Sequence, residues 1–332
     1  MKSHRILFRR AAVAVCLLFL GSGTALAADK TIRFGDLSWD SAQVHNRIAG
    51  FILKHGYGYE PEYIPGETIP IVTGLMRGDV DVDMESWTEN IQEVYDKGIA
   101  SGDLIDLGPN YSDSWQGWLV PTYMIEGDSE RGIEATAPDL KSVSDMAKYW
   151  ELFKDPESPS KGRFHNSIPG WSITDANSRR LKAYGLDKYY TDFMPGSDAA
   201  LAGSLAAAYR RGEPWFGYYW SPTWVLGLYD MTQLEEPAYD PEIWESTKAC
   251  AIPPNRVNIL VNRKLPERAP DAVAFLRKYE TTAELNNRFL AEMRSEKLDT
   301  RQVAEWFLKN HEDIWTGWVD AEVADKVKAA LE

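Results

Sequence analysis

The sequence predicts an α/β protein of two lobes, in which each lobe is a mostly parallel sheet flanked by helices. Short apolar segments typical of strands alternate with amphipathic segments typical of helices from residue 31 onward, as in doubly wound sheets. A charged stretch at residues 126–134 and a Pro- and Ser-rich stretch at 155–160 interrupt this alternation, which then resumes. About 305 residues follow a predicted leader, and this length suits two hydrophobic cores better than one.

The first lobe begins with a strand at residues 31–37 and an amphipathic helix at 41–55, whose apolar residues recur on one face. A strand, a helix and a third strand follow at 59–64, 69–77 and 80–87. Parallel sheets of this kind bind ligands beyond the carboxyl ends of their strands. Trp39 follows the first strand and Trp87 ends the third, so both are expected at that crevice.

The second lobe is expected to start near Leu119 and to repeat the same architecture. Its predicted helices and strands alternate at residues 162–166, 175–184, 199–211 and 214–219. Strands at 231–234 and 257–261 are expected to return to the first lobe, followed by helices at 270–279, 282–295, 300–310 and 320–331. The predicted division is therefore 28–118 with 224–332 for the first lobe and 119–223 for the second, with two crossovers.

Residues 1–27 have the features of a secretory signal peptide. Basic residues precede an apolar stretch at 11–20, and Ala25-Leu26-Ala27 is a small-x-small cleavage site. The apolar stretch is too short for a transmembrane helix, which needs about 20 residues. Cys16 follows Val15 instead of the small residue that a lipoprotein signal requires. We therefore expect cleavage after Ala27 and a soluble product in the periplasm.

Loss of this leader leaves 32 basic against 50 acidic residues, a net charge of −18. Such a surface repels nucleic acid and anionic lipid. Cys250 is then the one remaining cysteine, so a packed core instead of a disulfide must stabilise the chain. We expect a monomer.

The sequence offers little for catalysis. Its histidines show no metal-ligand spacing, and its glycines form neither a P-loop nor a dinucleotide fingerprint, so we expect no metal and no cofactor. Asp81 and Asp83 are interpreted as a solvated pair. A carbohydrate-active enzyme remains an alternative and would need two carboxylates that face each other across the cleft. A binding protein for sugars or amino acids is a third reading.

Tryptophan is the most informative residue type. The chain has 13, and six of them lie where strands end or loops begin: Trp39, Trp87, Trp115, Trp118, Trp171 and Trp220. Five others fall in helices or in the C-terminal segment, where packing is expected: Trp150, Trp244, Trp306, Trp315 and Trp318. Indole faces attract cations by roughly 0.5 to 2 kcal/mol each, and most selectively cations whose charge is spread over methyl groups. Three or four such faces would support micromolar binding.

The chain resembles the substrate-binding proteins of ABC importers for glycine betaine, choline and related quaternary amines. The resemblance runs from about Thr31 to Trp318 and rests on Trp39 and on an ordered set of short motifs. These are Gly78-Asp79-Val80-Asp81 leading to Trp87, Pro169-Gly170-Trp171, Ala183-Tyr184-Gly185-Leu186, Gly196-Ser197-Asp198-Ala199-Ala200, Trp220-Ser221-Pro222 and Leu234-Glu235-Glu236-Pro237. It implies a periplasmic binding protein fold (type II-like) that closes on its ligand and delivers it to an ABC transporter permease in the inner membrane.

Carried over residue by residue, the resemblance implies that Trp39, Trp87 and Trp220 are walls of an ammonium cage. Trp171 then approaches the ligand from the second lobe. Of Trp115 and Trp118, one is expected to face the cleft and the other to pack behind it.

Glu85 precedes Trp87 by two residues and therefore shares its side of the strand. A carboxylate in the cage would suit choline or an amine oxide and repel the carboxylate of betaine. The alternative, a Glu85 side chain outside the pocket, stays open. The ligand remains undecided among glycine betaine, choline, carnitine, trimethylamine N-oxide and a sulfonium analogue.

Overall fold

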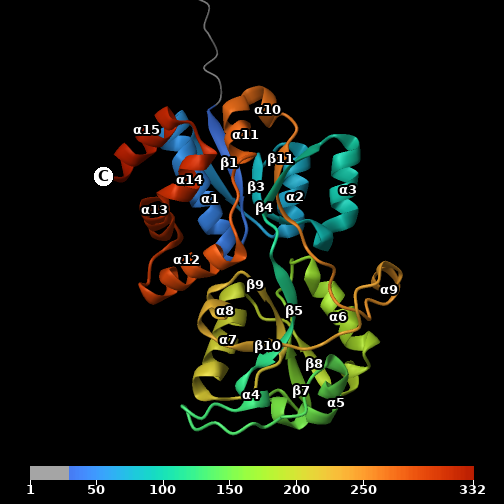
Figure 1. Cartoon of the computed structure of the whole chain (residues 1–332). Coiled ribbons are helices and arrows are strands. Elements are labelled where there is room, and N and C mark those ends of the chain that lie inside the picture. Colours follow the sequence, from blue (N-terminus) through green and yellow to red (C-terminus); the bar gives the residue numbers. More distant parts are fainter. Residues whose placement is uncertain (1–29) are drawn as a thin grey trace, which may run out of the picture.

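The computed structural model describes residues 30–332 and arranges them in two lobes, each built on one mixed sheet (Figure 1). The predicted signal peptide lies outside the described residues. The first sheet has the order β2-β1-β3-β11-β4, with bounds Glu60–Pro65, Thr31–Asp36, Val82–Trp87, Val257–Asn262 and Leu104–Tyr111. The second has the order β10-β5-β9-β7-β6, with bounds Met231–Gln233, Trp115–Pro121, Gly217–Ser221, Ser158–His165 and Lys154–Asp155, and β8 (Tyr190–Phe193) pairs with β7.

Chain direction between the lobes explains why both sheets are mixed. In the first sheet β1 pairs in parallel with β2 and β3, whereas β11 runs antiparallel to β3 and β4. β11 brings the chain back from the second lobe, so it must run away from the boundary that β1 and β3 approach. In the second sheet β5 carries the chain away from the boundary and is antiparallel to β9, which is itself parallel to β7. The two-lobed α/β prediction is confirmed.

Helices cover both sheets, and their bounds agree with most of the predicted periodic segments. In the first lobe they are α1 Asp40–Ile52, α2 Thr68–Arg77, α3 Gln92–Ser101, α10 Leu265–Arg268, α11 Pro270–Leu276, α12 Ala283–Ser295, α13 Thr300–Asn310, α14 Glu312–Trp315 and α15 Ala321–Leu331. In the second they are α4 Tyr123–Glu126, α5 Met146–Tyr149, α6 Ile173–Ala183, α7 Asp198–Arg211, α8 Trp224–Leu228 and α9 Pro241–Ser246.

Short turns set the direction in which α1 and α2 leave the sheet. Trp39 has extended backbone and is the N-cap residue of α1, and one π-helical turn at Leu53–Tyr57 continues α1. Gly78 ends α2 with φ of 86°, a left-handed conformation that glycine adopts without steric cost. The site residue Trp39 is therefore fixed between β1 and the first turn of α1.

The strand predicted at residues 231–234 lies in the second sheet and not in the first. β10 pairs antiparallel with β5, with Thr232 opposite Val120. Its pairing partner follows the first crossover, so β10 completes the second sheet before the chain leaves it. We propose that the return to the first lobe lies between β10 and β11 instead of at residue 224. The stretch predicted as a loop at 155–160 is partly a hairpin, because Lys154 and Asp155 of β6 pair with β7.

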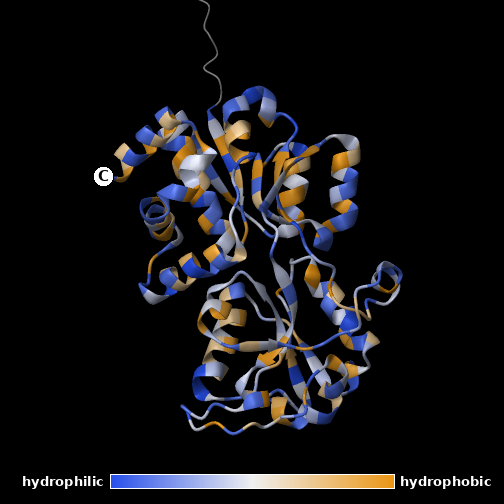
Figure 2. Cartoon of the chain, viewed as in Figure 1, coloured by the Kyte–Doolittle hydropathy of each residue, from blue (hydrophilic) through white to orange (hydrophobic). Residues whose placement is uncertain are grey.

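Apolar residues concentrate on the strands and on the inward helix faces, whereas the outer helix faces are polar (Figure 2). The five tryptophans predicted to pack, Trp150, Trp244, Trp306, Trp315 and Trp318, all contact this core. Asp81 and Asp83 are buried, which contradicts their expected solvated position. Asp81 pairs with Arg33 and Arg268, and Asp83 accepts a hydrogen bond from the Glu85 backbone. Within residues 30–332 no helix combines the length and apolar character needed to cross a membrane.

Candidate functional site

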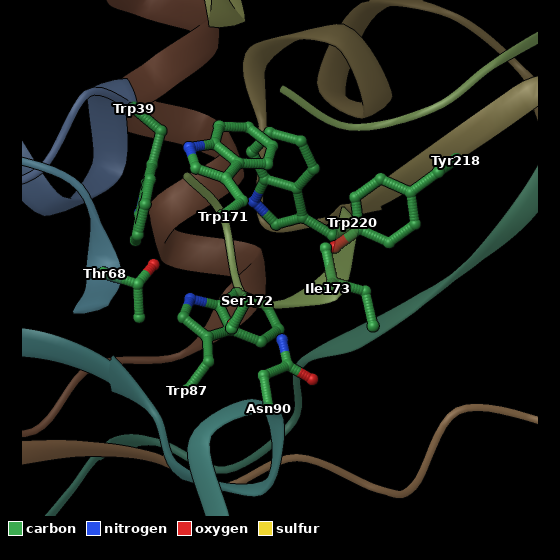
Figure 3. A pocket seen from close by; sticks show the side chains of 9 residues that line it. All are labelled: Trp39, Thr68, Trp87, Asn90, Trp171, Ser172, Ile173, Tyr218 and Trp220. Carbon is green, nitrogen blue, oxygen red and sulfur yellow. The ribbon is translucent and has the colours of Figure 1, made fainter. Parts of the chain in front are cut away.

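A cavity between the two lobes holds four of the predicted tryptophans (Figure 3). It encloses about 320 Å³ of space between atoms, part of it continuous with solvent. The first lobe contributes Trp39, Thr68, Trp87 and Asn90, and the second contributes Trp171, Ser172, Ile173, Tyr218 and Trp220. The structure therefore brings together the whole predicted core of the cage, with Trp171 as an additional wall.

Strand ends place these four indoles at the lobe boundary. Trp39 follows β1 and Trp87 is the last residue of β3, so both extend from carboxyl ends of the first sheet. Trp171 lies between β7 and α6, and Trp220 is near the end of β9, in the second sheet. All four side chains are buried, and Figure 3 shows their rings around one shared space.

The rings meet nearly at right angles. Trp171 lies 5.5 Å from Trp39 at 83° and 4.9 Å from Trp220 at 87°, both measured between ring centroids. Edge-to-face packing is favourable for aromatic rings and forms corners, whereas parallel stacking would leave no space between them. Tyr218 extends the wall and stacks on Trp220 at 6.0 Å.

Glu85 lies behind the cage and does not line it. Its side chain is fully buried, and its Oε1 accepts hydrogen bonds from the indole N–H of Trp39 at 2.6 Å and of Trp87 at 3.2 Å. The Ser41 hydroxyl donates to the same oxygen at 3.0 Å. Burial raises the pKa of Glu85 to about 7, although these donors act in the opposite direction.

Polar side chains join the lobes beside the cavity. Gln116 of β5 donates to Asn90 Oδ1 at 2.9 Å and accepts from the Tyr218 hydroxyl at 2.7 Å. On the opposite side the indole N–H of Trp171 donates to Ser38 Oγ at 3.2 Å. The hydrogen bonds of Gln116 with Asn90 and of Trp171 with Ser38 connect the two lobes beside the cavity, whose lining comes from both.

The structure brings neither Trp115 nor Trp118 into the cavity. Trp118 is fully buried in the second lobe, where its indole N–H donates to Asn177 and the Arg180 guanidinium lies 4.6 Å from its ring centroid. That face is therefore already covered by a cation, whose charge Glu236 balances. Trp115 is 36% exposed and is not among the lining residues.

Sequence reasoning missed five lining residues: Thr68, Asn90, Ser172, Ile173 and Tyr218. Ser172 and Ile173 follow the Pro-Gly-Trp motif directly, and Tyr218 precedes Trp220 by two residues on one strand, so adjacency to a predicted wall was a usable signal. Asn90 follows Trp87 by three residues, in the turn Thr88–Ile91, whereas Thr68, the first residue of α2, has no predicted wall next to it in the chain. Among the described residues, none that lines the cavity carries a charge.

Two carboxylates from opposite lobes meet beside the cage, and the sequence did not indicate them. Asp40 of α1 and Asp198 of α7 line a neighbouring space of about 230 Å³ behind Trp39 and Trp220. Burial raises the pKa of Asp198 to about 8, and the charges of Asp40 and Glu67 add to this effect. Within residues 30–332 no group of three or more histidine, cysteine or acidic side chains could hold a metal ion.

A family model describing the substrate-binding domain of ABC-type glycine betaine transport systems matches residues 30–310. The chain belongs to this family. Its members are substrate-binding proteins of ABC transporters, and this substrate-binding protein works with a membrane permease.

Individual relatives and solved structures support this family assignment. The glycine betaine/proline betaine-binding periplasmic protein of Escherichia coli is 23% identical over 266 residues, 76% of this chain and 78% of that protein. The glycine betaine/carnitine transport binding protein GbuC of Listeria monocytogenes is 24% identical over 48% of this chain and 50% of its own length. The glycine betaine/L-proline-binding protein ProX of Borrelia burgdorferi has a TM-score of 0.71 at 21% identity, covering 90% of this chain and 99% of that one.

A choline-binding protein of an ABC transporter, solved with choline, also has a TM-score of 0.71, at 17% identity over 92% of this chain and 99% of that one. At these identities the two structures show a shared fold. The substrate-binding protein described here therefore has the fold expected of its family.

Proposed function

We propose that this substrate-binding protein captures a small methylated ammonium compound in the tryptophan cage between its lobes. The observation that carries the proposal is the arrangement of Trp39, Trp87, Trp171 and Trp220 around one space with no charged lining residue among those described. A methylated ammonium group cannot donate a hydrogen bond, and it is weakly hydrated, so aromatic faces bind it better than polar side chains do.

The cage supports micromolar affinity. Four indole faces at roughly 0.5 to 2 kcal/mol each contribute about 2 to 8 kcal/mol of cation–π attraction, to which burial of the methyl groups adds. The cost of association is reduced because hydrogen bonds to Glu85 and Ser38 already hold three of the rings. A Kd near 1 μM requires about 8 kcal/mol, which is within this range.

The remainder of the ligand meets neutral groups. Thr68, Asn90 and Ser172 offer hydroxyl and amide groups, and the described lining offers no Arg, Lys or His to pair with a carboxylate. This lining suits the hydroxyl of choline, and it accepts a zwitterion such as glycine betaine if neutral donors hold its carboxylate. Named relatives bind glycine betaine, proline betaine and carnitine, so we include these ligands in the proposal.

We further propose that the chain is exported, that its leader is cleaved after Ala27, and that it acts in the periplasm as a monomer that delivers its ligand to an ABC transporter permease. The Escherichia coli relative is a periplasmic protein, which supports this compartment. N-terminal sequencing of the exported protein and light scattering of the purified protein test the cleavage site and the monomer.

Calorimetric titration with glycine betaine, choline, carnitine and trimethylamine N-oxide tests the ligand class, with glucose and maltose as controls. We expect at least one methylated amine to bind with a Kd of micromolar order and neither sugar to bind. If a sugar binds and no methylated amine does, the proposal is wrong, and the tryptophans form a platform for sugar rings instead of an ammonium cage.

A further inference from the structure

Glu85 connects two walls of the cage through a single oxygen atom. The indole N–H groups of Trp39 and Trp87, which come from different elements of the first lobe, both donate to Glu85 Oε1. Figure 3 shows Trp39 and Trp87 at neighbouring walls of the cavity. A buried indole N–H without an acceptor costs about 1 to 3 kcal/mol, so these hydrogen bonds fix both ring orientations. Any charge on Glu85 therefore lies directly behind the proposed cation site.

No positive charge balances Glu85 within the described chain. The groups that face it are Ser41 of α1, Tyr111 of β4, Tyr279 after α11, and Asp83 on its own strand, and His45 of α1 is hydrogen-bonded to Tyr279. Burial lowers the pKa of His45 to about 3 and raises the pKa of both tyrosines, so all three are neutral. Burial raises the pKa of Asp83 to about 6, so Asp83 supplies only a like charge. Glu85 Oε2 has no hydrogen-bond partner of good geometry.

We propose that Glu85 couples ligand capture to proton release, because the methylated cation in the cavity and the ionised carboxyl behind Trp39 and Trp87 stabilise each other. On capture the carboxyl O–H bond breaks, the proton passes to the solvent buffer, and the electron pair remains on the carboxylate oxygen. Glu85 acts through the two rings and is a positioning residue that also supplies the counter-charge. This inference rests on the proposed function.

The sign of the pH dependence follows from the burial of Glu85. Without a ligand, burial favours the neutral acid and raises the pKa of Glu85 to about 7. A cation in the cavity favours the carboxylate and lowers that pKa, so by linkage the ligand binds the ionised form more tightly. Affinity is then highest above about pH 7 and falls as the pH drops toward the pKa of the complex. A difference of one pKa unit corresponds to about a tenfold change in Kd.

Calorimetry on the full exported chain tests this coupling with choline and glycine betaine, neither of which titrates between about pH 5 and 9. At pH 7, titrations in phosphate and in Tris differ in observed enthalpy by the number of protons exchanged times the difference in buffer ionisation enthalpy. We expect about half a proton to be released per ligand bound, and a Kd about tenfold weaker at pH 5 than at pH 8.5. The number of protons that the wild-type protein releases on binding is measured without any variant. This measurement therefore decides the question even if a substituted protein does not fold.

Glu85→Gln keeps an oxygen for the two indoles and removes the charge. We expect this variant to release no proton and to bind at every pH with roughly the affinity that the wild type has at pH 5. Asp83→Asn is the matched control, since Asp83 is an equally buried acid two residues away that bonds to no indole. It should still release a proton when the ligand binds, because Glu85 and both indole hydrogen bonds remain.

The outcomes separate this inference from the proposed function. Binding of choline or glycine betaine by the wild type without proton release overturns the coupling alone, and so does proton release that survives in Glu85→Gln. Failure of both compounds to bind overturns the proposed function and this inference with it. A purely structural role for Glu85 would weaken binding by the same factor at all pH values and would leave no proton exchange.

Discussion

Trp171 contacts both lobes at once, and its surroundings illustrate how single residues form the cage. Its ring meets Trp39 of the first lobe and Trp220 of its own lobe edge to face, and its indole N–H donates to Ser38. The sequence indicated these tryptophans because each follows or ends a strand. It did not separate Trp115 and Trp118 from them, because the cation that covers Trp118 belongs to Arg180, which is distant along the chain. The alternation of side chains along a strand predicted that Glu85 lies on the same side as Trp87. It could not show that the Glu85 side chain lies behind the Trp87 ring and not in the cavity.

Trp171→Ala should weaken the binding of a methylated ammonium ligand by about 1 to 2 kcal/mol, roughly five- to thirtyfold, because one indole face and the contact with Trp39 are lost. Calorimetric titration measures this change, and thermal melting verifies that the variant folds. Trp115→Ala is the control, since Trp115 is exposed and lies outside the cavity, and its Kd should stay within about twofold of the wild type. Equal losses in both variants would mean that general destabilisation, and not the cage, lowers the affinity.

Asp198→Asn should stabilise the protein at pH 8. Burial raises the pKa of Asp198 from 3.8 to about 8, so the folded protein holds a proton that the unfolded chain loses above about pH 4. The free energy of unfolding attributable to this side chain therefore falls as the pH rises from 4 to 8. Asparagine removes this cost, which exceeds the roughly 0.5 kcal/mol of favourable interaction with the N-terminus of α7 that it loses.

Melting temperatures of Asp198→Asn and wild type at pH 4 and pH 8 measure this effect. We expect the variant to melt several degrees higher at pH 8 and at nearly the wild-type temperature at pH 4. Asp175→Asn, at an exposed position in the first turn of α6, controls for a general change of charge. A lower melting temperature for Asp198→Asn at pH 8 would show that Asp198 is ionised and stabilising.

At the scale of elements, local periodicity predicts helices and strands well but does not predict their partners. The helix predicted at residues 199–211 is α7, Asp198–Arg211, because its apolar face and the Ser197 cap are both local signals. The strand predicted at 231–234 is β10, but its pairing with β5 depends on residues more than 100 positions earlier in the chain. A strand of three residues, Met-Thr-Gln, carries too little pattern to favour either sheet. The sequence pattern therefore could not determine to which lobe this strand belongs.

Gly217 shows how closely β7 and β9 approach each other at the cage. A Cβ atom at Gly217 would lie 2.4 Å from the backbone oxygen of His165, its partner on β7. Gly217→Ala should therefore cost about 2 kcal/mol of stability, because the backbone of one strand must shift. It should also weaken binding, since β9 carries Trp220.

Gly203→Ala is the matched control, because nothing lies within 4 Å of an added Cβ there and the position is inside α7. We expect this control to gain about 0.5 to 1 kcal/mol of stability. Urea unfolding curves of both variants measure the difference. Wild-type stability in Gly217→Ala would contradict the observed register of β7 and β9.

At the scale of the molecule, the chain crosses between the lobes at two places in the described residues, from β4 to β5 and from β10 to β11. The walls of the cage are divided between the lobes, and the hydrogen bonds of Gln116 with Asn90 and of Trp171 with Ser38 connect them beside the cavity. Helix α12 also contacts α8 of the second lobe. The lining of the cage comes from both lobes, so the cage is complete only where the lobes lie together, an arrangement suited to capturing and releasing a ligand.

A crystal structure of the protein with the methylated amine that binds most tightly in the calorimetric panel tests the central claim most directly. We expect the N-methyl carbon atoms to lie within van der Waals distance, about 4 Å, of the rings of Trp39, Trp87, Trp171 and Trp220. Glu85 should remain behind Trp39 and Trp87 without touching the ligand. An ammonium group bound elsewhere, such as against Trp115, or a cavity that stays empty beside a bound ligand, would contradict the account.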